Sequence, residues 1–147
     1  MDAFDNLKNA IVQQAAEDYA AAFMGNEVGG KKPADMMQEC EKFFRSGWYT
    51  ELTNGAIDGG WLARNLKIRE LEKAAKAYEA MLGICNSTTF RSTVTFPKEK
   101  GKEKPKPMNY IFPPRFAGDI MGTLRIQLET IKAEIRELEK ENKGADV

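Results

Sequence analysis

Apolar residues recur at alternating spacings of three and four over residues 115–142. This period predicts a long C-terminal helix with a three-heptad, coiled-coil-like seam. When the seam residues are assigned alternately to the a and d positions of the heptad, every core position is apolar and the charged residues lie outside the seam. The six seam residues are Met121, Leu124, Leu128, Ile131, Ile135 and Leu138.

The sequence leaves the partner of this seam open between the chain's own helices and a second copy. A parallel homodimer would place Glu134 opposite Glu139, whereas an antiparallel pair would let Lys132 meet Glu139. Ile126 lies outside the seam, so the first half of the helix needs a second apolar cover. The seam continues well past Glu134, which favours a homodimer over a purely intramolecular bundle.

Three earlier stretches show the same helical period and predict helices over about residues 5–24, 33–53 and 58–82. Aspartate caps or a proline open them, and glycine or asparagine ends them. The expected starts are Asp5, Pro33 and Asp58, and the expected stops are Gly25-Asn26, Asn54-Gly55 and Gly83.

The period changes to two over residues 88–112, which predicts a β-hairpin. Its tip, residues 97–107, has five lysines and no apolar residue except proline, so we expect a mobile arm. The arm is either a solvated loop or a basic finger that reaches a phosphate backbone or an acidic protein groove. Its lysines are Lys98, Lys100, Lys102, Lys104 and Lys106.

These patterns together predict a mainly α fold. We expect a helical bundle with an inserted β-hairpin and a long C-terminal heptad helix, forming a single domain over residues 1–147.

Composition indicates an ordinary globular chain, with 42% hydrophobic and 30% charged residues. No apolar run is long enough for a membrane span, and Met1–Asp5 lacks the pattern of a secretory signal. We therefore expect a cytoplasmic protein that does not interact with membranes. Cys40 and Cys85 are then expected to be reduced, small buried residues.

The chain contains no histidine. That removes the commonest general base, the imidazole metal ligand and any histidine-dependent triad. No phosphate-binding glycine loop or nucleophile elbow is present either. The sequence therefore predicts a protein that is not an enzyme and has no cofactor.

The net charge is zero but unevenly distributed: residues 1–60 carry −5, residues 61–115 carry +7 and the remainder carries −2. Basic residues on the predicted helix 58–82 form a candidate basic face, interpreted either as a solvated surface or as a nucleic-acid contact. They are Arg64, Lys67, Lys73 and Lys76.

Residues 43–49 are rich in aromatic side chains, and one helical stripe cannot bury all of their rings. Core packing is the main interpretation of this cluster. The alternative is a binding hot spot in which Phe43, Arg45 and Tyr49 contact a partner.

The motif Cys-x-x-Phe-Phe-Arg-Ser-x-Trp from Cys40 to Trp48, followed by Asp-Gly-x-x-Leu from Asp58 to Leu62, resembles a group of small uncharacterised proteins encoded in Firmicutes prophages and mobile elements. The resemblance covers roughly residues 1–68. It implies a phage-borne context in a bacterial host cell, and it assigns no activity to individual residues.

Three function classes follow. The first is a phage- or mobile-element-encoded interaction protein that inhibits a bacterial host factor, such as a CRISPR-type defence nuclease, by binding its surface. The second is a nucleic-acid-binding accessory factor that uses the lysine-rich arm. The third is a structural or assembly protein that oligomerises through the C-terminal coiled coil.

Overall fold

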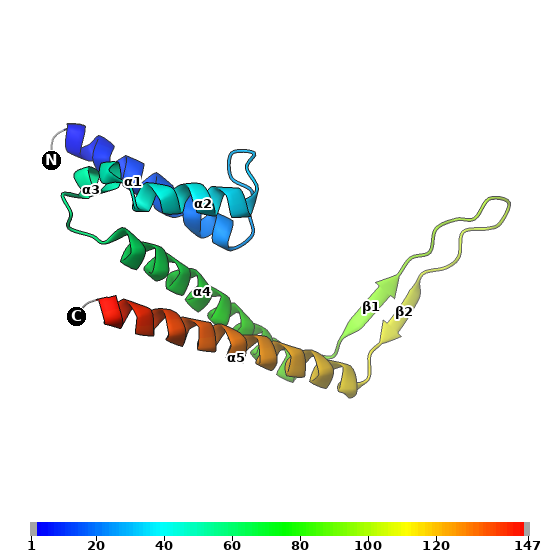
Figure 1. The fold of residues 1–147 in the computed structure, drawn as a ribbon. Coiled ribbons are helices and arrows are strands. Elements are labelled where there is room, and N and C mark those ends of the chain that lie inside the picture. Colours follow the sequence, from blue (N-terminus) through cyan, green and yellow to red (C-terminus); the bar gives the residue numbers. More distant parts are fainter. Residues whose placement is uncertain (1–2, 146–147) are drawn as a thin grey trace. The chain divides into compact units, whose positions relative to one another are not determined.

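A computed structural model describes residues 3–145 and confirms the mainly α fold (Figure 1). Met1 and Asp2, the first residues of the segment that lacks a secretory-signal pattern, lie outside the described residues. The elements in chain order are α1 (Ala3–Phe23), α2 (Pro33–Phe44), α3 (Gly47–Thr53), α4 (Gly59–Ser87), β1 (Arg91–Val94), β2 (Met108–Ile111) and α5 (Pro114–Ala145).

The chain divides into two compact units, each of which takes one end of α4 and one end of α5. We call residues 3–74 with 131–145 the helical unit, and residues 75–130 the hairpin unit. The expectation of a single domain remains a prediction about whether the two units unfold together.

An aromatic core holds the helical unit together. Tyr19 of α1, Phe44 of α2 and Tyr49 of α3 are 0%, 3% and 2% exposed. The Phe44 ring lies 5.7 Å from each of the two tyrosine rings, in edge-to-face arrangements that favour aromatic packing. Ala22 of α1, Met36 and Cys40 of α2 and Leu66 of α4 complete this core.

The predicted helix over residues 33–53 is wrong in one respect, because it is two helices. α2 ends at Phe44, and Ser46 caps α3 by accepting a hydrogen bond at its Oγ from the backbone N–H of Tyr49 at 3.1 Å. The same hydroxyl donates to the carbonyl of Phe43 at 2.6 Å. A serine cap within an aromatic run therefore ends one helix and starts the next.

Other predicted helix ends are partly right. Asp58 caps α4 as expected, since its Oδ2 accepts from the N–H of Trp61 at 2.8 Å. Asp5, however, lies in the first turn of α1, which begins at Ala3. Gly83 does not end α4 either, because the helix continues to Ser87 and carries Cys85, only 3% exposed, into a buried position.

The predicted hairpin is present as an antiparallel pair in which Arg91 faces Ile111 and Val94 faces Met108. Its tip contains a turn in which the N–H of Lys102 donates to the carbonyl of Glu99 at 3.1 Å. Gly101 has φ 83°, which a residue with a side chain rarely adopts. The expected mobility of this arm remains a prediction.

The seam of α5 is only partly covered within the described chain. Leu128 is 6% exposed, and the other five seam residues are partly buried. The cover that the sequence requires for Ile126 is missing in the described chain, since this side chain is 67% exposed. Whether the seam is completed by the chain's own helices or by a second copy therefore stays open.

Candidate functional site

The predicted aromatic hot spot is mostly core. The prediction that Tyr49 contacts a partner is wrong, because α3 folds back onto α2 and buries this side chain in the core. Phe43 is partly buried and Arg45 is exposed. The exposed ring of this cluster is Trp48, 56% accessible and 5.8 Å from the Phe43 ring.

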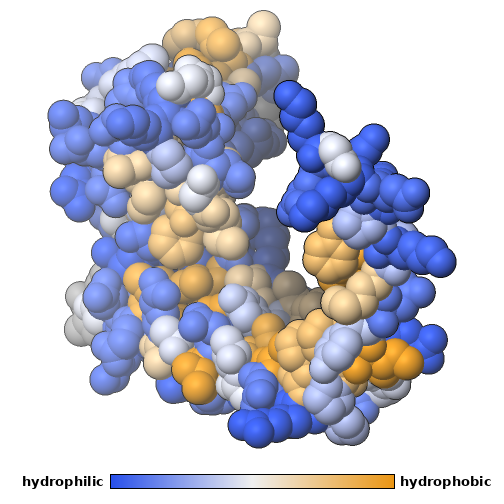
Figure 2. All heavy atoms as spheres, turned by 90° about the vertical axis from the view of Figure 1, so that its right-hand side faces the viewer, coloured by the Kyte–Doolittle hydropathy of each residue, from blue (hydrophilic) through white to orange (hydrophobic). Residues whose placement is uncertain are grey.

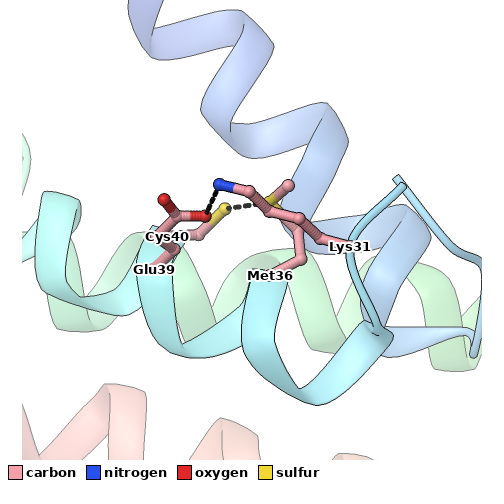
Figure 3. Close-up of polar contacts among 4 residues, drawn as sticks. All are labelled: Lys31, Met36, Glu39 and Cys40. Carbon is pink, nitrogen blue, oxygen red and sulfur yellow. Dashed lines mark hydrogen bonds and ion pairs between the residues drawn. The ribbon is translucent and has the colours of Figure 1, made fainter. Parts of the chain in front are cut away.

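A shallow apolar groove of about 440 Å³ runs beside these rings in the helical unit. At its edge the Lys31 ammonium pairs with Glu39, and the Cys40 thiol donates to the Met36 sulfur at 3.7 Å (Figure 3). Burial raises the pKa of Cys40 to about 11, so the thiol is protonated at neutral pH and unsuited to nucleophilic attack.

The predicted basic face does not form one stripe. Arg64 donates from Nε to the Asn142 side chain at 2.6 Å, and Lys67 lies 5.9 Å from the centre of the Tyr19 ring. Lys73 pairs with Glu70 at 2.9 Å on the exposed surface. Lys76 is exposed in the hairpin unit. Arg64 and Lys67 therefore contact other residues of the helical unit, whereas Lys73 and Lys76 face solvent.

The hairpin presents a line of apolar side chains to solvent, which we call the hairpin surface: Val94, Phe96, Met108 and Tyr110. These residues are 36%, 41%, 47% and 46% exposed. Alternation along the paired strands puts Val94, Met108 and Tyr110 on one face of the sheet. Phe96 follows the same alternation just past the end of β1.

The base of the hairpin is fixed by aromatic packing on α5. Phe90 and Phe112 lie 5.4 Å and 4.2 Å from the ring of Phe116. The Tyr110 ring is 4.9 Å from that of Phe112, so it extends this packed series into solvent. A groove of about 810 Å³ lies beside the base, between the end of α4 and the start of α5.

All five predicted lysines of the tip are exposed. Lys102 pairs with Glu99 at 3.1 Å, with both side chains at least 70% accessible. Figure 2 shows hydrophilic side chains at the end of the hairpin and hydrophobic ones closer to its base. The hairpin unit thus combines an apolar surface with a basic tip.

This arrangement is suited to binding. Among residues 3–145 no group of three or more cysteine, aspartate or glutamate side chains is placed to hold a metal ion. None of the described helices is both long enough and apolar enough to cross a membrane.

The alternation in the sequence predicted the strands that carry the hairpin surface. It did not identify Trp48 and Tyr110 as exposed, because a pattern of apolar residues does not show which face of an element is covered.

Comparison with known proteins yields no match: no family model, curated protein or solved structure is significantly similar to this chain.

Proposed function

We propose that the protein acts by binding another protein through the hairpin surface and the lysine-rich tip. The observation that carries this proposal is the run of apolar side chains, each more than a third exposed, on a two-stranded sheet fixed at its base. A contiguous exposed apolar surface rimmed by polar residues is typical of an interaction site.

The composition of the surface favours a protein partner with an acidic rim. Aromatic residues and methionine are enriched at the centres of protein interfaces, and Tyr110 and Met108 supply both. The tip carries five lysines against Glu99 and Glu103, so it would steer an acidic surface toward the apolar centre.

The finer proposal is a phage- or mobile-element-encoded inhibitor of a bacterial host factor, such as a CRISPR-type defence nuclease, acting in the host cytoplasm. Its support is the resemblance carried by roughly residues 1–68. The hairpin lies beyond that region, so the shared segment would supply the frame and the hairpin would supply the contact with the host protein.

The test is affinity capture from host cells with the tagged protein and a Met108→Ala/Tyr110→Ala variant. Ile111→Ala is the matched control, because Ile111 is 61% exposed on the opposite face of the same strand. We expect the wild type and the control to retain a specific host protein and the double variant to lose it. Equal capture by all three proteins, with unchanged circular dichroism, would contradict the proposal.

Nucleic-acid binding is the second candidate, favoured by five lysines beside the exposed rings of Phe96 and Tyr110. Stacking on aromatic rings next to lysines is a common way to hold single strands. Fluorescence anisotropy with a labelled oligonucleotide at two salt concentrations separates the candidates. Binding that weakens by about 10³-fold or more between 50 and 200 mM salt would replace the protein-binding proposal.

Assembly through α5 is the third candidate, favoured by the exposed Ile126. In a homodimer, the melting temperature of the wild type would rise with protein concentration, and Ile126→Glu would dissociate it. Sedimentation at micromolar concentration gives the answer directly. A single species of 16.5 kDa would exclude the homodimer at that concentration.

A further inference from the structure

The helical unit contains a small hollow of about 210 Å³ that is separate from the hairpin surface. Basic side chains from α4 and from the end of α2 line it, together with two glutamates and the ring of Tyr19. The charged lining residues are Arg45, Arg64, Lys67, Glu41 and Glu141.

Arg64 is held in one orientation by a buried partner. Its Nε donates to Oδ1 of Asn142 at 2.6 Å, and Asn142 is only 8% exposed. Asn142 is the only amide or charged residue that is buried among those described. A buried amide that accepts from Nε fixes the plane of the guanidinium group and leaves its two terminal nitrogens for another ligand.

Gly60 makes room for this guanidinium group. A Cβ atom at Gly60 would lie 3.2 Å from Oδ2 of Asp58, 3.3 Å from Nη1 and 3.8 Å from Nη2 of Arg64, so the Asp58 carboxylate and the guanidinium group both lie beside the glycine. Neither terminal nitrogen has a hydrogen bond or ion pair to the described residues. The pair of parallel N–H groups at this end is the geometry that binds two oxygens of one oxyanion.

The carboxylates of the hollow do not neutralise the basic groups by direct pairing. Glu41 accepts a hydrogen bond from the Tyr19 hydroxyl at 3.0 Å. Lys67 lies 5.9 Å from the rings of both Tyr19 and Phe23, a position over aromatic faces. The lining has three basic groups against two glutamates, and the Asp58 carboxylate beside Gly60 brings the charge around the hollow close to balance.

We propose that this hollow binds an oxyanion, either a carboxylate or a phosphate group, through two parallel hydrogen bonds from Arg64, with Arg45 and Lys67 supplying further positive charge. Its volume suits a small ligand or the end of a larger one. Because the charge around the hollow is close to balanced, a singly charged group is favoured, and a carboxylate is expected to bind at least as well as phosphate. This site is independent of the proposed hairpin contact.

The experiment is a titration of the full-length protein with acetate and, separately, with inorganic phosphate, at an ionic strength kept constant with sodium chloride. Two-dimensional NMR follows the arginine Nε–H signals. We expect a saturable shift of the Arg64 signal with at least one of the two anions. Binding of acetate alone would identify a carboxylate site, and binding of phosphate alone would identify a phosphate site.

Two variants and a control make the result specific. Arg64→Lys keeps the charge but removes the paired donors, so affinity should fall about tenfold, and Lys67→Gln should lower it less. These variants are followed through backbone amide signals near Gly60. Arg69→Gln removes the same charge from an exposed position of α4 and should leave affinity unchanged.

Asn142→Leu tests the positioning role of the buried amide. The substitution frees Nε, so the guanidinium group loses its fixed plane and anion affinity should fall several-fold while the charge is retained. Circular dichroism confirms that each variant is folded. The proposal is overturned if neither anion causes a saturable shift, or if Arg64→Lys binds as tightly as the wild type.

Discussion

The helical unit and the hairpin unit both contain clustered aromatic side chains, but only the helical unit contains rings that are fully buried. Tyr19, Phe44 and Tyr49 are at most 3% exposed, whereas Phe96 and Tyr110 are more than 40% exposed. In the helical unit the Phe44 ring of α2 is covered by the Tyr19 and Tyr49 rings of two other helices. In the hairpin a ring beyond the base has only the neighbouring strand beside it, and one layer cannot exclude water. The same residue types thus stabilise one region and are available for binding in the other.

The largest expected effect comes from opening the buried cluster. Phe44→Ala should lower the free energy of unfolding by about 3–5 kcal/mol, because it removes a ring that contacts Tyr19 and Tyr49. Trp48→Ala, an exposed neighbour in the same cluster, should cost about 1 kcal/mol or less. Denaturant unfolding measures both. Similar losses for the two variants would contradict the observed division between core and surface.

A smaller loss is expected at the contact between α2 and the start of α4. A Cβ atom at Gly59 would lie 2.0 Å from the carbonyl oxygen of Phe44, so Gly59→Ala should cost about 1–3 kcal/mol through forced displacement. Gly83→Ala, also in α4, meets nothing within 4 Å and should stabilise the protein by about 0.5–1 kcal/mol. Thermal unfolding of the two variants should therefore shift in opposite directions.

The two buried tyrosines are expected to differ when each loses its hydroxyl. Tyr19 donates to Glu41, so Tyr19→Phe should cost about 1 kcal/mol. The hydroxyl of Tyr49 has no hydrogen-bond partner among the described residues, so Tyr49→Phe should be neutral or slightly stabilising. The difference between the two midpoints of urea unfolding is the measurement. A larger loss for Tyr49→Phe would mean that its hydroxyl is bonded in solution.

The smallest effect on stability is expected at the tip. Replacing residues 98–104 with a short glycine-containing turn removes only exposed side chains, so the melting temperature should stay nearly unchanged. Loss of partner capture without loss of stability would show that the lysines contribute to binding. A drop of several kcal/mol would instead show that the tip packs against the protein in solution.

The sequence predicted the helical periods and the hairpin, because a period of three to four or of two follows from element geometry alone. The sequence did not predict the break at Ser46, because a serine is tolerated inside a helix. Only the structure shows that its hydroxyl caps α3. The sequence also ended α4 too early at Gly83, where burial of Cys85 outweighs the local cost of glycine.

The candidate site was harder to predict than the fold. Tyr49 and Trp48 are neighbours of the same chemical class, yet one is 2% and the other 56% exposed. That difference depends on the angle at which α3 returns to α2, which no local pattern specifies. The lysines of the tip could be identified from sequence because a run without apolar side chains has nothing to bury.

Just outside the paired strands, a backbone hydrogen bond joins the two ends of the hairpin: the N–H of Phe112 donates to the carbonyl of Phe90 at 2.9 Å. We expect changes in the tip, residues 97–107, to leave this hydrogen bond and the start of α5 in place, because the tip lies beyond the paired strands. If the hairpin binds a partner as proposed, the sequence of its tip can therefore change without altering the helices that carry it.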